Sequence, residues 1–147
     1  MSAERGLVDT NVLIYAFDPG FEHHEPCRRL FDDAKPGKSE LCFVPQVLIE
    51  FYAVVTNPRR VHTPRSGDEA LGAIRFLLAL PGTVLLPNPA DLVERWIGLL
   101  ERHPVTGRRV FDVQLVAAML GNNIQTLYTF NTSDFEAFDE CDAVTPS

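Results

Sequence analysis

Short apolar runs alternate with longer amphipathic segments along this chain, and this alternation limits the fold more than any other feature. The runs expected to form strands are Gly6–Asp9, Glu40–Val44, Thr83–Leu86 and Gln125–Phe130, with a short edge strand near Ala143-Val144. The segments expected to form helices are Glu22–Ala34, Pro45–Thr56, Ser66–Leu80, Asp91–Arg102 and Arg109–Leu120. Strands that alternate with helices form parallel sheets covered by helices. The sequence therefore predicts an α/β protein, a three-layer α/β/α sandwich around a short, mainly parallel central sheet.

Local signals indicate where several of these helices begin and end. The stretch Ser66–Glu69 has the spacing of a capping box at a helix start, and Gly121 suits the residue that follows a helix. One segment is ambiguous, because Thr10–Phe17 fits a strand by its β-propensity and also fits a short helix. In the helical interpretation, Thr10 or Asn11 is the N-cap.

Length and composition limit the class of protein. A chain of 147 residues that is 46% hydrophobic and 22% charged is expected to form one globular domain, residues 1–147, without disulfides or a structural metal. No apolar run reaches the length of a membrane span, and the three cysteines lack metal-binding spacing, so we expect a cytoplasmic protein with reduced thiols. The net charge is −7, but 11 of the 13 basic residues are arginines, several of them in clusters. Such clusters can still hold phosphate groups when a divalent metal lies between the acids and the substrate.

Carboxylates occur where this architecture places ligands. Asp9 ends the first strand, and Asn131 and Asp134 follow the strand that ends at the Thr-Phe pair before them. The carboxyl ends of parallel strands open on one crevice, so these side chains are expected to lie close together. Glu50 and Asp112 are each the only acid of an apolar helical segment, where an acid is costly to bury unless it is paired or bound to a metal.

Taken singly, Glu50 and Asp112 fit better as helix residues near solvent than as site residues. Together with the acids at the strand ends they indicate converging carboxylates, which repel one another unless a cation lies between them. Hard oxygen ligands suit Mg²⁺ or Mn²⁺. Acid clusters that hold one or two such ions hydrolyse phosphodiester bonds with water. The pattern therefore predicts a metal-dependent phosphodiesterase.

Four stretches, in order along nearly the whole chain, resemble the PIN-domain ribonucleases and, within that family, the VapC-type toxins of bacterial toxin–antitoxin modules. They are Val8–Tyr15, Gln46–Phe51 with the following Thr56-Asn57-Pro58, Thr106–Ala117, and Leu127–Phe135. No single stretch is specific, but the four together are. The resemblance implies an endoribonuclease that needs Mg²⁺ or Mn²⁺, an RNA substrate, a cognate antitoxin protein and a homodimer.

The resemblance also implies roles for single residues. Catalytic roles fall on Asp9, Glu50, Asp112, Asn131 and Asp134. The metal ligands it implies are Asp9 and Asp112. Substrate contacts fall on Thr10, Asn11, Arg108, Arg109 and Thr129. The two arginines fit equally well as surface residues at a helix start.

One position departs from the family's pattern. Family members often carry aspartate two residues after the threonine that ends the last core strand, and here that place holds Asn131. An asparagine can coordinate a metal through its carbonyl oxygen but brings no charge. This substitution favours a site with one ion, unless Asp134 supplies the missing charge.

Other functions fit the residues less well or remain open. A PIN-like module that binds RNA or protein with weak or no catalysis is the main alternative, and Asn131 favours it. A haloacid-dehalogenase-like phosphatase requires an aspartate two residues after Asp9, where Asn11 stands. A dinucleotide-binding fold lacks support because no glycine-rich fingerprint follows any expected strand.

The segments Pro45–Thr56 and Ser66–Leu80 carry more apolar residues than one buried helix face requires. In the second segment they are Ile74, Phe76, Leu77, Leu78 and Leu80. Burial on two sides, as in a contact between subunits, explains this excess, and so does full burial inside one domain. We expect a homodimer.

Overall fold

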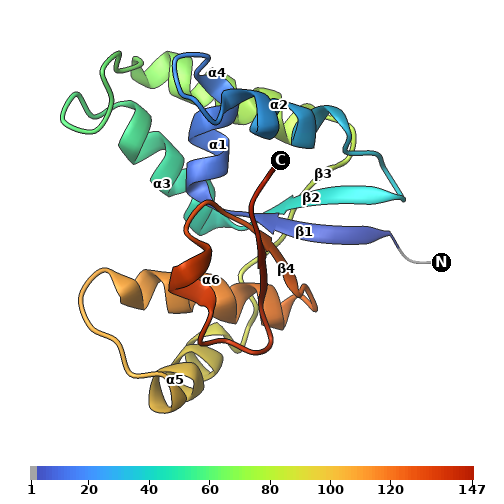
Figure 1. The fold of residues 1–147 in the computed structure, drawn as a ribbon, viewed down its shortest axis with the longest axis vertical. Helices are drawn as coiled ribbons and strands as arrows, with labels where there is room; N and C mark the ends of the chain where they lie inside the picture. Colours follow the sequence, from blue (N-terminus) through green and yellow to red (C-terminus); the bar gives the residue numbers. More distant parts are fainter. Residues whose placement is uncertain (1–2) are drawn as a thin grey trace.

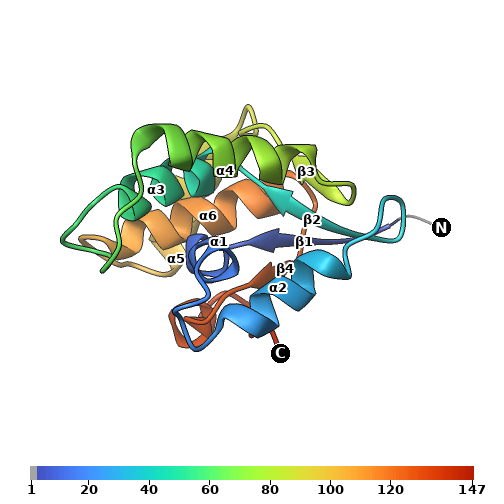
Figure 2. The same cartoon turned by 90° about the horizontal axis from the view of Figure 1, so that it is seen from above.

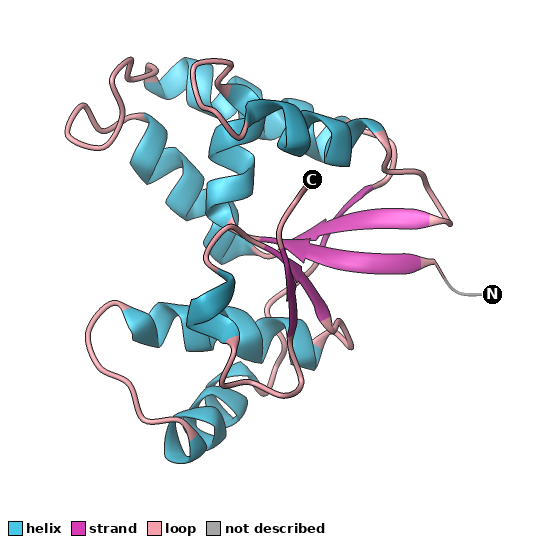
Figure 3. Ribbon diagram, in the orientation of Figure 1, coloured by secondary structure: helices cyan, strands magenta, loops and turns pink. Residues whose placement is uncertain are grey.

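The computed structural model describes residues 3–147, and its centre is a five-stranded sheet (Figure 3). The strands are β1 (Glu4–Val8), β2 (Ser39–Phe43), β3 (Thr83–Leu85), β4 (Thr126–Tyr128) and β5 (Asp142–Val144). They lie in the order β3-β2-β1-β4-β5, and every pairing between them is parallel. The predicted parallel sheet is confirmed, with β5 as the short edge strand.

Helices cover this sheet from two sides. They are α1 (Thr10–Phe17), α2 (His24–Asp32), α3 (Pro45–Val55), α4 (Gly67–Ala79), α5 (Leu92–Arg102) and α6 (Arg109–Gly121), with a 3₁₀ turn, η1 (Thr132–Phe135). In Figure 1 the strands lie between an upper group, α1 to α4, and a lower pair, α5 and α6. This is the predicted three-layer arrangement. Within residues 3–147, no helix combines the length and the apolarity that crossing a membrane requires.

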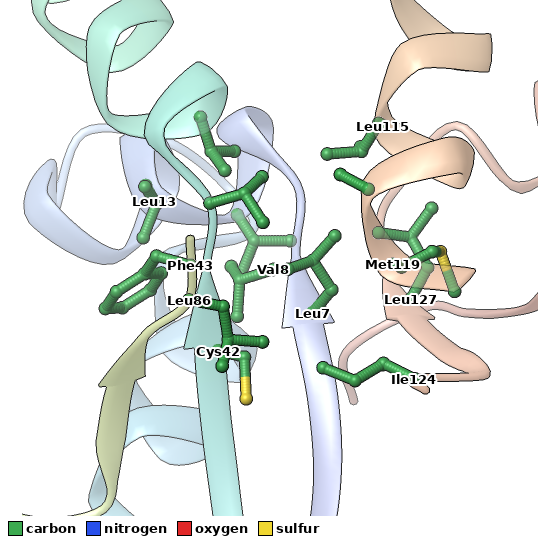
Figure 4. Packing of buried hydrophobic residues seen from close by; sticks show 14 of the residues in the cluster. Leu7, Val8, Leu13, Cys42, Phe43, Leu86, Leu115, Met119, Ile124 and Leu127 are labelled. Carbon is green, nitrogen blue, oxygen red and sulfur yellow. The ribbon is translucent and has the colours of Figure 1, made fainter. Parts of the chain in front are cut away.

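The central strand β1 is apolar on both faces. Leu7 and Val8 are fully buried and lie between Leu13 of α1 on one side and Met119 of α6 on the other (Figure 4). Each buried side chain of this size stabilises the fold by about 1.5–3 kcal/mol. Because both faces of β1 are packed, its carboxyl end, where Asp9 follows, is held in one place.

The helix starts show one success and one correction. The capping box at the start of α4 is formed, with Glu69 N donating to Ser66 Oγ at 3.1 Å and Ser66 N donating to Glu69 Oε1 at 3.0 Å. The segment after β1 is a helix, but the predicted N-cap, Thr10 or Asn11, is wrong. Asp9 is the N-cap, because β1 passes directly into α1 and the Asp9 carboxylate accepts a hydrogen bond from Thr10 N at 2.8 Å.

The end of α6 also differs from the prediction. Gly121 is the last residue of the helix rather than the residue after it, and the left-handed backbone conformation falls on Asn123 (φ 59°). Glycine is required at position 121 for a different reason, since a Cβ there would collide with the ring of Pro89. The glycine therefore serves close packing rather than helix termination.

Candidate active site

A pocket of about 360 Å³ lies at the carboxyl edge of the sheet. Figure 2 shows β1 and β2 running in the same direction toward α1 and α6, whose first turns contribute to the pocket. Nine of the ten site residues that the sequence predicts line this pocket: Asp9, Thr10, Asn11, Glu50, Arg108, Arg109, Asp112, Asn131 and Asp134. The tenth, Thr129, is fully buried and does not line it.

Asp9 is held by hydrogen bonds on both carboxylate oxygens. Oδ1 accepts from Thr10 N and Oδ2 accepts from the Thr129 hydroxyl, each at 2.8 Å. Burial raises the pKa of Asp9 above its ordinary value, and the charges of Glu50 and Asp134 raise it further, while the two hydrogen bonds lower it. The carboxylate is thus fixed in orientation but surrounded by negative charge.

Thr129 acts from beneath the pocket. Its hydroxyl donates to Asp9 and also accepts from Asn131 N at 3.1 Å and, more weakly, from Asn11 Nδ2 at 3.4 Å. The side-chain Oδ1 of Asn11 in turn accepts a hydrogen bond from Phe130 N at 3.3 Å. These contacts join the start of α1 to the turn after β4. They fix the position of Asn131 relative to Asp9.

Glu50 comes from α3, on the side of the pocket opposite β4. Its Oε2 accepts a hydrogen bond from the Thr10 hydroxyl at 3.0 Å, which links α3 to the first turn of α1. Thr10 itself is only 5% exposed. The Thr10 hydroxyl is therefore engaged with Glu50, and the second Glu50 oxygen is left for other partners.

Asp112 lies in the first turn of α6 and receives no hydrogen bond on its carboxylate from residues 3–147. Burial raises its pKa to about 6, and the charges of Asp9 and Asp134 add to this shift, while Arg109 opposes it. A half-buried carboxylate next to like charges is unfavourable unless a cation joins it. The electrostatics of Asp112 therefore suit a divalent ion.

Two further polar residues, Gln46 and Arg60, line the pocket although the sequence did not mark them as site residues. Gln46 Nε2 donates to the Phe111 carbonyl oxygen at 3.0 Å, and Gln46 Oε1 is buried without a partner in the described chain. The sequence could have indicated Gln46, because it lies one helical turn before Glu50 and so shares the same face of α3. Arg60 lies in the loop after α3, and its place in the pocket could not be predicted, because only its position in an arginine cluster set it apart.

The donor set fits a hard divalent ion, although no ready-made cage exists. Four acids line the pocket, namely Asp9, Glu50, Asp112 and Asp134, and none of them forms an ion pair with a basic side chain of residues 3–147. Within the same residues, no three acidic, histidine or cysteine side chains lie close enough together to hold a metal. Repulsion keeps unpaired carboxylates apart, and a bound cation removes that repulsion. Carboxylate and amide oxygens are the ligands that Mg²⁺ and Mn²⁺ prefer.

Residues 6–140 match the family model described as "PIN domain". The chain belongs to the PIN domain family. The resemblance inferred from the four sequence stretches is thereby confirmed, and the match includes every residue that lines the pocket. Among characterised PIN proteins, the chain is 26% identical to "Ribonuclease VapC24" of Mycobacterium tuberculosis over 131 residues, which is 89% of each chain. It is 32% identical to "Ribonuclease VapC43" of the same species over 119 residues, or 79% of each.

Solved PIN structures share the fold. The structure of M. tuberculosis VapC20, described as a "Sarcin-Ricin loop cleaving toxin", superposes with a TM-score of 0.67 at 22% identity and covers 90% of this chain and 94% of that one. A "Toxin-antitoxin complex from Klebsiella pneumoniae" superposes with a TM-score of 0.63 at 20% identity over 97% and 98% of the two chains. At these identities the superpositions establish the fold.

Proposed function

We propose that this PIN-domain protein is an endoribonuclease, the toxin of a toxin–antitoxin module, which hydrolyses RNA phosphodiester bonds with Mg²⁺ or Mn²⁺. The observation that carries this proposal is the convergence of four acids on one pocket, none of them in an ion pair with a basic side chain of residues 3–147. They come from four separate parts of the fold and are Asp9, Glu50, Asp112 and Asp134. Relatives over most of the chain bear the name ribonuclease. The pocket chemistry and those names agree on phosphodiester cleavage.

Asp9 and Asp112 are the residues that would hold the ion. Asp9 is oriented by its two hydrogen bonds, and the Asp112 carboxylate accepts no hydrogen bond from residues 3–147 and is free to bind an ion. A bound divalent ion supplies positive charge that favours attack of water on phosphorus and departure of the leaving oxygen. Arg108 and Arg109 line the same pocket and supply positive charge for the flanking phosphates.

Glu50 is the group best placed to orient water. Its Oε2 is occupied by the Thr10 hydroxyl, so its other oxygen can accept a hydrogen bond from water and draw a proton from it during attack. Asn131 brings a neutral amide to the family's fourth position, and Asp134, three residues later, brings a negative charge to the same pocket. We propose that one ion suffices, with Asn131 orienting water or a phosphate oxygen.

The test is cleavage of an RNA pool by purified protein with Mn²⁺ or with EDTA. We expect cleavage with Mn²⁺, none with EDTA, and loss of cleavage in Asp9→Asn and Asp112→Asn. Asp139→Asn is the matched control, because Asp139 is exposed and lies outside the pocket. Full cleavage in EDTA or in either site variant would refute the assignment.

Two features favour a second function, namely the neutral Asn131 and the absence of a preformed trio of metal ligands among residues 3–147. In this alternative the protein is a PIN-like module that binds RNA or protein with weak or no catalysis. Binding of RNA by the wild-type protein without cleavage at any Mn²⁺ concentration would establish it. Cleavage that disappears in Asp9→Asn would exclude it.

The antitoxin and homodimer proposals are supported by an exposed apolar face on α3 and α4. Ile49 is 69% exposed, and together with Tyr52 and Leu71 it borders an apolar hollow of about 330 Å³. Leu77 faces the core, but Phe76 and its neighbours on α4 remain exposed, so the domain alone does not bury both sides of α4. Light scattering at micromolar concentration tests the homodimer, and a monomer there would count against it.

A further inference from the structure

We propose that an apolar cavity between α5 and α6 is a subsite for one nucleobase of the RNA substrate, with Phe111 as its stacking surface. This inference rests on the proposed ribonuclease function and deepens it, because it names a group that would select the substrate. The cavity has a volume of about 230 Å³. Its lining is Leu92, Val93, Trp96, Val110, Phe111 and Gln114.

The cavity adjoins the acid-lined pocket at one shared residue. Phe111 lines both, and Asp112, the proposed metal ligand, is the next residue along α6. A nucleotide whose phosphate lies at Asp112 therefore has its base within reach of this cavity. Arg108 and Arg109, one turn earlier at the start of α6, line the acid pocket beside Phe111 and suit the phosphates on either side.

Phe111 is a large aromatic side chain that is 56% exposed and stands on a turn of backbone that the fold fixes. Its carbonyl oxygen accepts the Gln46 amide at 3.0 Å, which fixes the backbone of this turn to α3. The floor of the cavity is equally fixed, because the Trp96 indole N–H donates to the Val110 carbonyl oxygen at 3.0 Å. Rigid exposed aromatic rings beside basic side chains are surfaces on which single-stranded RNA bases stack.

Gln114 gives the cavity a polar group. It follows Phe111 by three residues, so both side chains lie on one face of α6. Its amide forms no hydrogen bond with residues 3–147, and an amide offers both donor and acceptor atoms to a base edge. An otherwise apolar cavity with one free amide fits a planar heterocycle better than a phosphate or a charged side chain.

The experiment compares RNAs that differ by one base. A single-stranded RNA of about 12 nucleotides, chosen because the wild-type protein cleaves it, is prepared with an abasic residue at each position around the cleaved bond in turn. Binding is measured by fluorescence anisotropy in the Asp9→Asn background, so that cleavage does not interfere. Phe111→Ala removes the ring and Phe111→Trp keeps a stacking surface. Leu85→Ala is the matched control, since Leu85 is 49% exposed and lines neither pocket.

We expect one abasic position to weaken binding about 10-fold or more, the range of single base–aromatic stacking contacts. In Phe111→Ala the intact RNA should bind with the same loss, and the abasic change should then cost little more. Phe111→Trp should restore the difference between intact and abasic RNA, and Leu85→Ala should leave it unchanged. Gln114→Leu should alter which base is preferred at that position, with smaller effect on abasic RNA.

The alternative occupant of this cavity is a second copy of the chain. If Phe111→Ala converts a dimer to a monomer in light scattering while the abasic effect persists, the cavity is a contact between subunits and the proposal is wrong. An abasic effect that is equal in the wild-type and Phe111→Ala proteins refutes it in the same way. Failure of the wild-type protein to cleave any RNA with Mn²⁺ would instead refute the proposed function itself.

Discussion

Replacing Asp112 by asparagine is expected to abolish RNA cleavage while making the metal-free protein more stable. The carboxylate is half-buried, receives no hydrogen bond from the described residues, and has its pKa raised to about 6 by burial and by the neighbouring acids. Because this pKa lies above the ordinary value of 3.8, the folded protein holds the proton more tightly than the unfolded chain does. The ionised group therefore destabilises the fold above pH 6, and this penalty fades as the pH falls from about 6 toward 3.8.

The size of the effect follows from the shift. Two pKa units correspond to about 3 kcal/mol, and partial access of solvent reduces this to about 1–2 kcal/mol. A domain of this length gains roughly 2–4 °C in Tm for each kcal/mol. Asp112→Asn should thus melt roughly 2–8 °C above the wild-type protein at pH 7.5 in EDTA, and the two curves should converge near pH 4.

Thermal unfolding at the two pH values, with Asp139→Asn as control, measures this difference directly. Mn²⁺ should raise the Tm of the wild-type protein, because an ion that binds only the folded state stabilises it, and should raise that of Asp112→Asn much less. RNA cleavage by the variant should fall by at least about 100-fold, which corresponds to about 2.7 kcal/mol of transition-state stabilisation. A variant that is less stable at pH 7.5 would show that Asp112 forms stabilising contacts in the metal-free protein. An equally active variant would show that Asp112 does not bind the catalytic ion.

Three other outcomes follow from the same site. Cleavage should decline as the pH falls below about 6, because protonated Asp112 cannot bind a metal, and added Mn²⁺ should partly restore it in rate measurements across pH. Gln46→Leu keeps the size of the side chain but removes the hydrogen bond to the Phe111 carbonyl that fixes the start of α6. Its kcat/KM should therefore drop about 10-fold, and an unchanged kcat/KM would contradict a positioning role. Asp134→Ala should leave the calorimetric Mn²⁺ stoichiometry at one if a single ion suffices, and a fall from two ions to one with a large loss of rate would contradict the one-ion proposal.

Much of the fold was predictable because its signals are local. The capping box at Ser66 and Glu69 involves residues three positions apart. The apolar patterns of the strands and helices likewise extend over short stretches of sequence. The acids could be placed on one edge of the sheet for a related reason, since parallel strands bring their carboxyl ends together whatever their loops contain. The errors were also local, at the start of α1 and the end of α6. At both places neighbouring residues have similar preferences for a cap position, and tertiary packing decides which of them takes it.

The sequence by itself determined the alternation of strands and helices, the order of the acids, and the family signature. The tertiary structure alone decided which groups meet across the pocket. Thr129 reaches Asp9 across 120 residues, and Gln46 reaches the Phe111 carbonyl across 65. Periodicity and capping carry no information about such pairs, because these contacts depend on how α1, α3, α6 and β4 pack against one another. The same packing leaves Phe111 exposed beside the acids, although a phenylalanine in an apolar helix is more often part of a core.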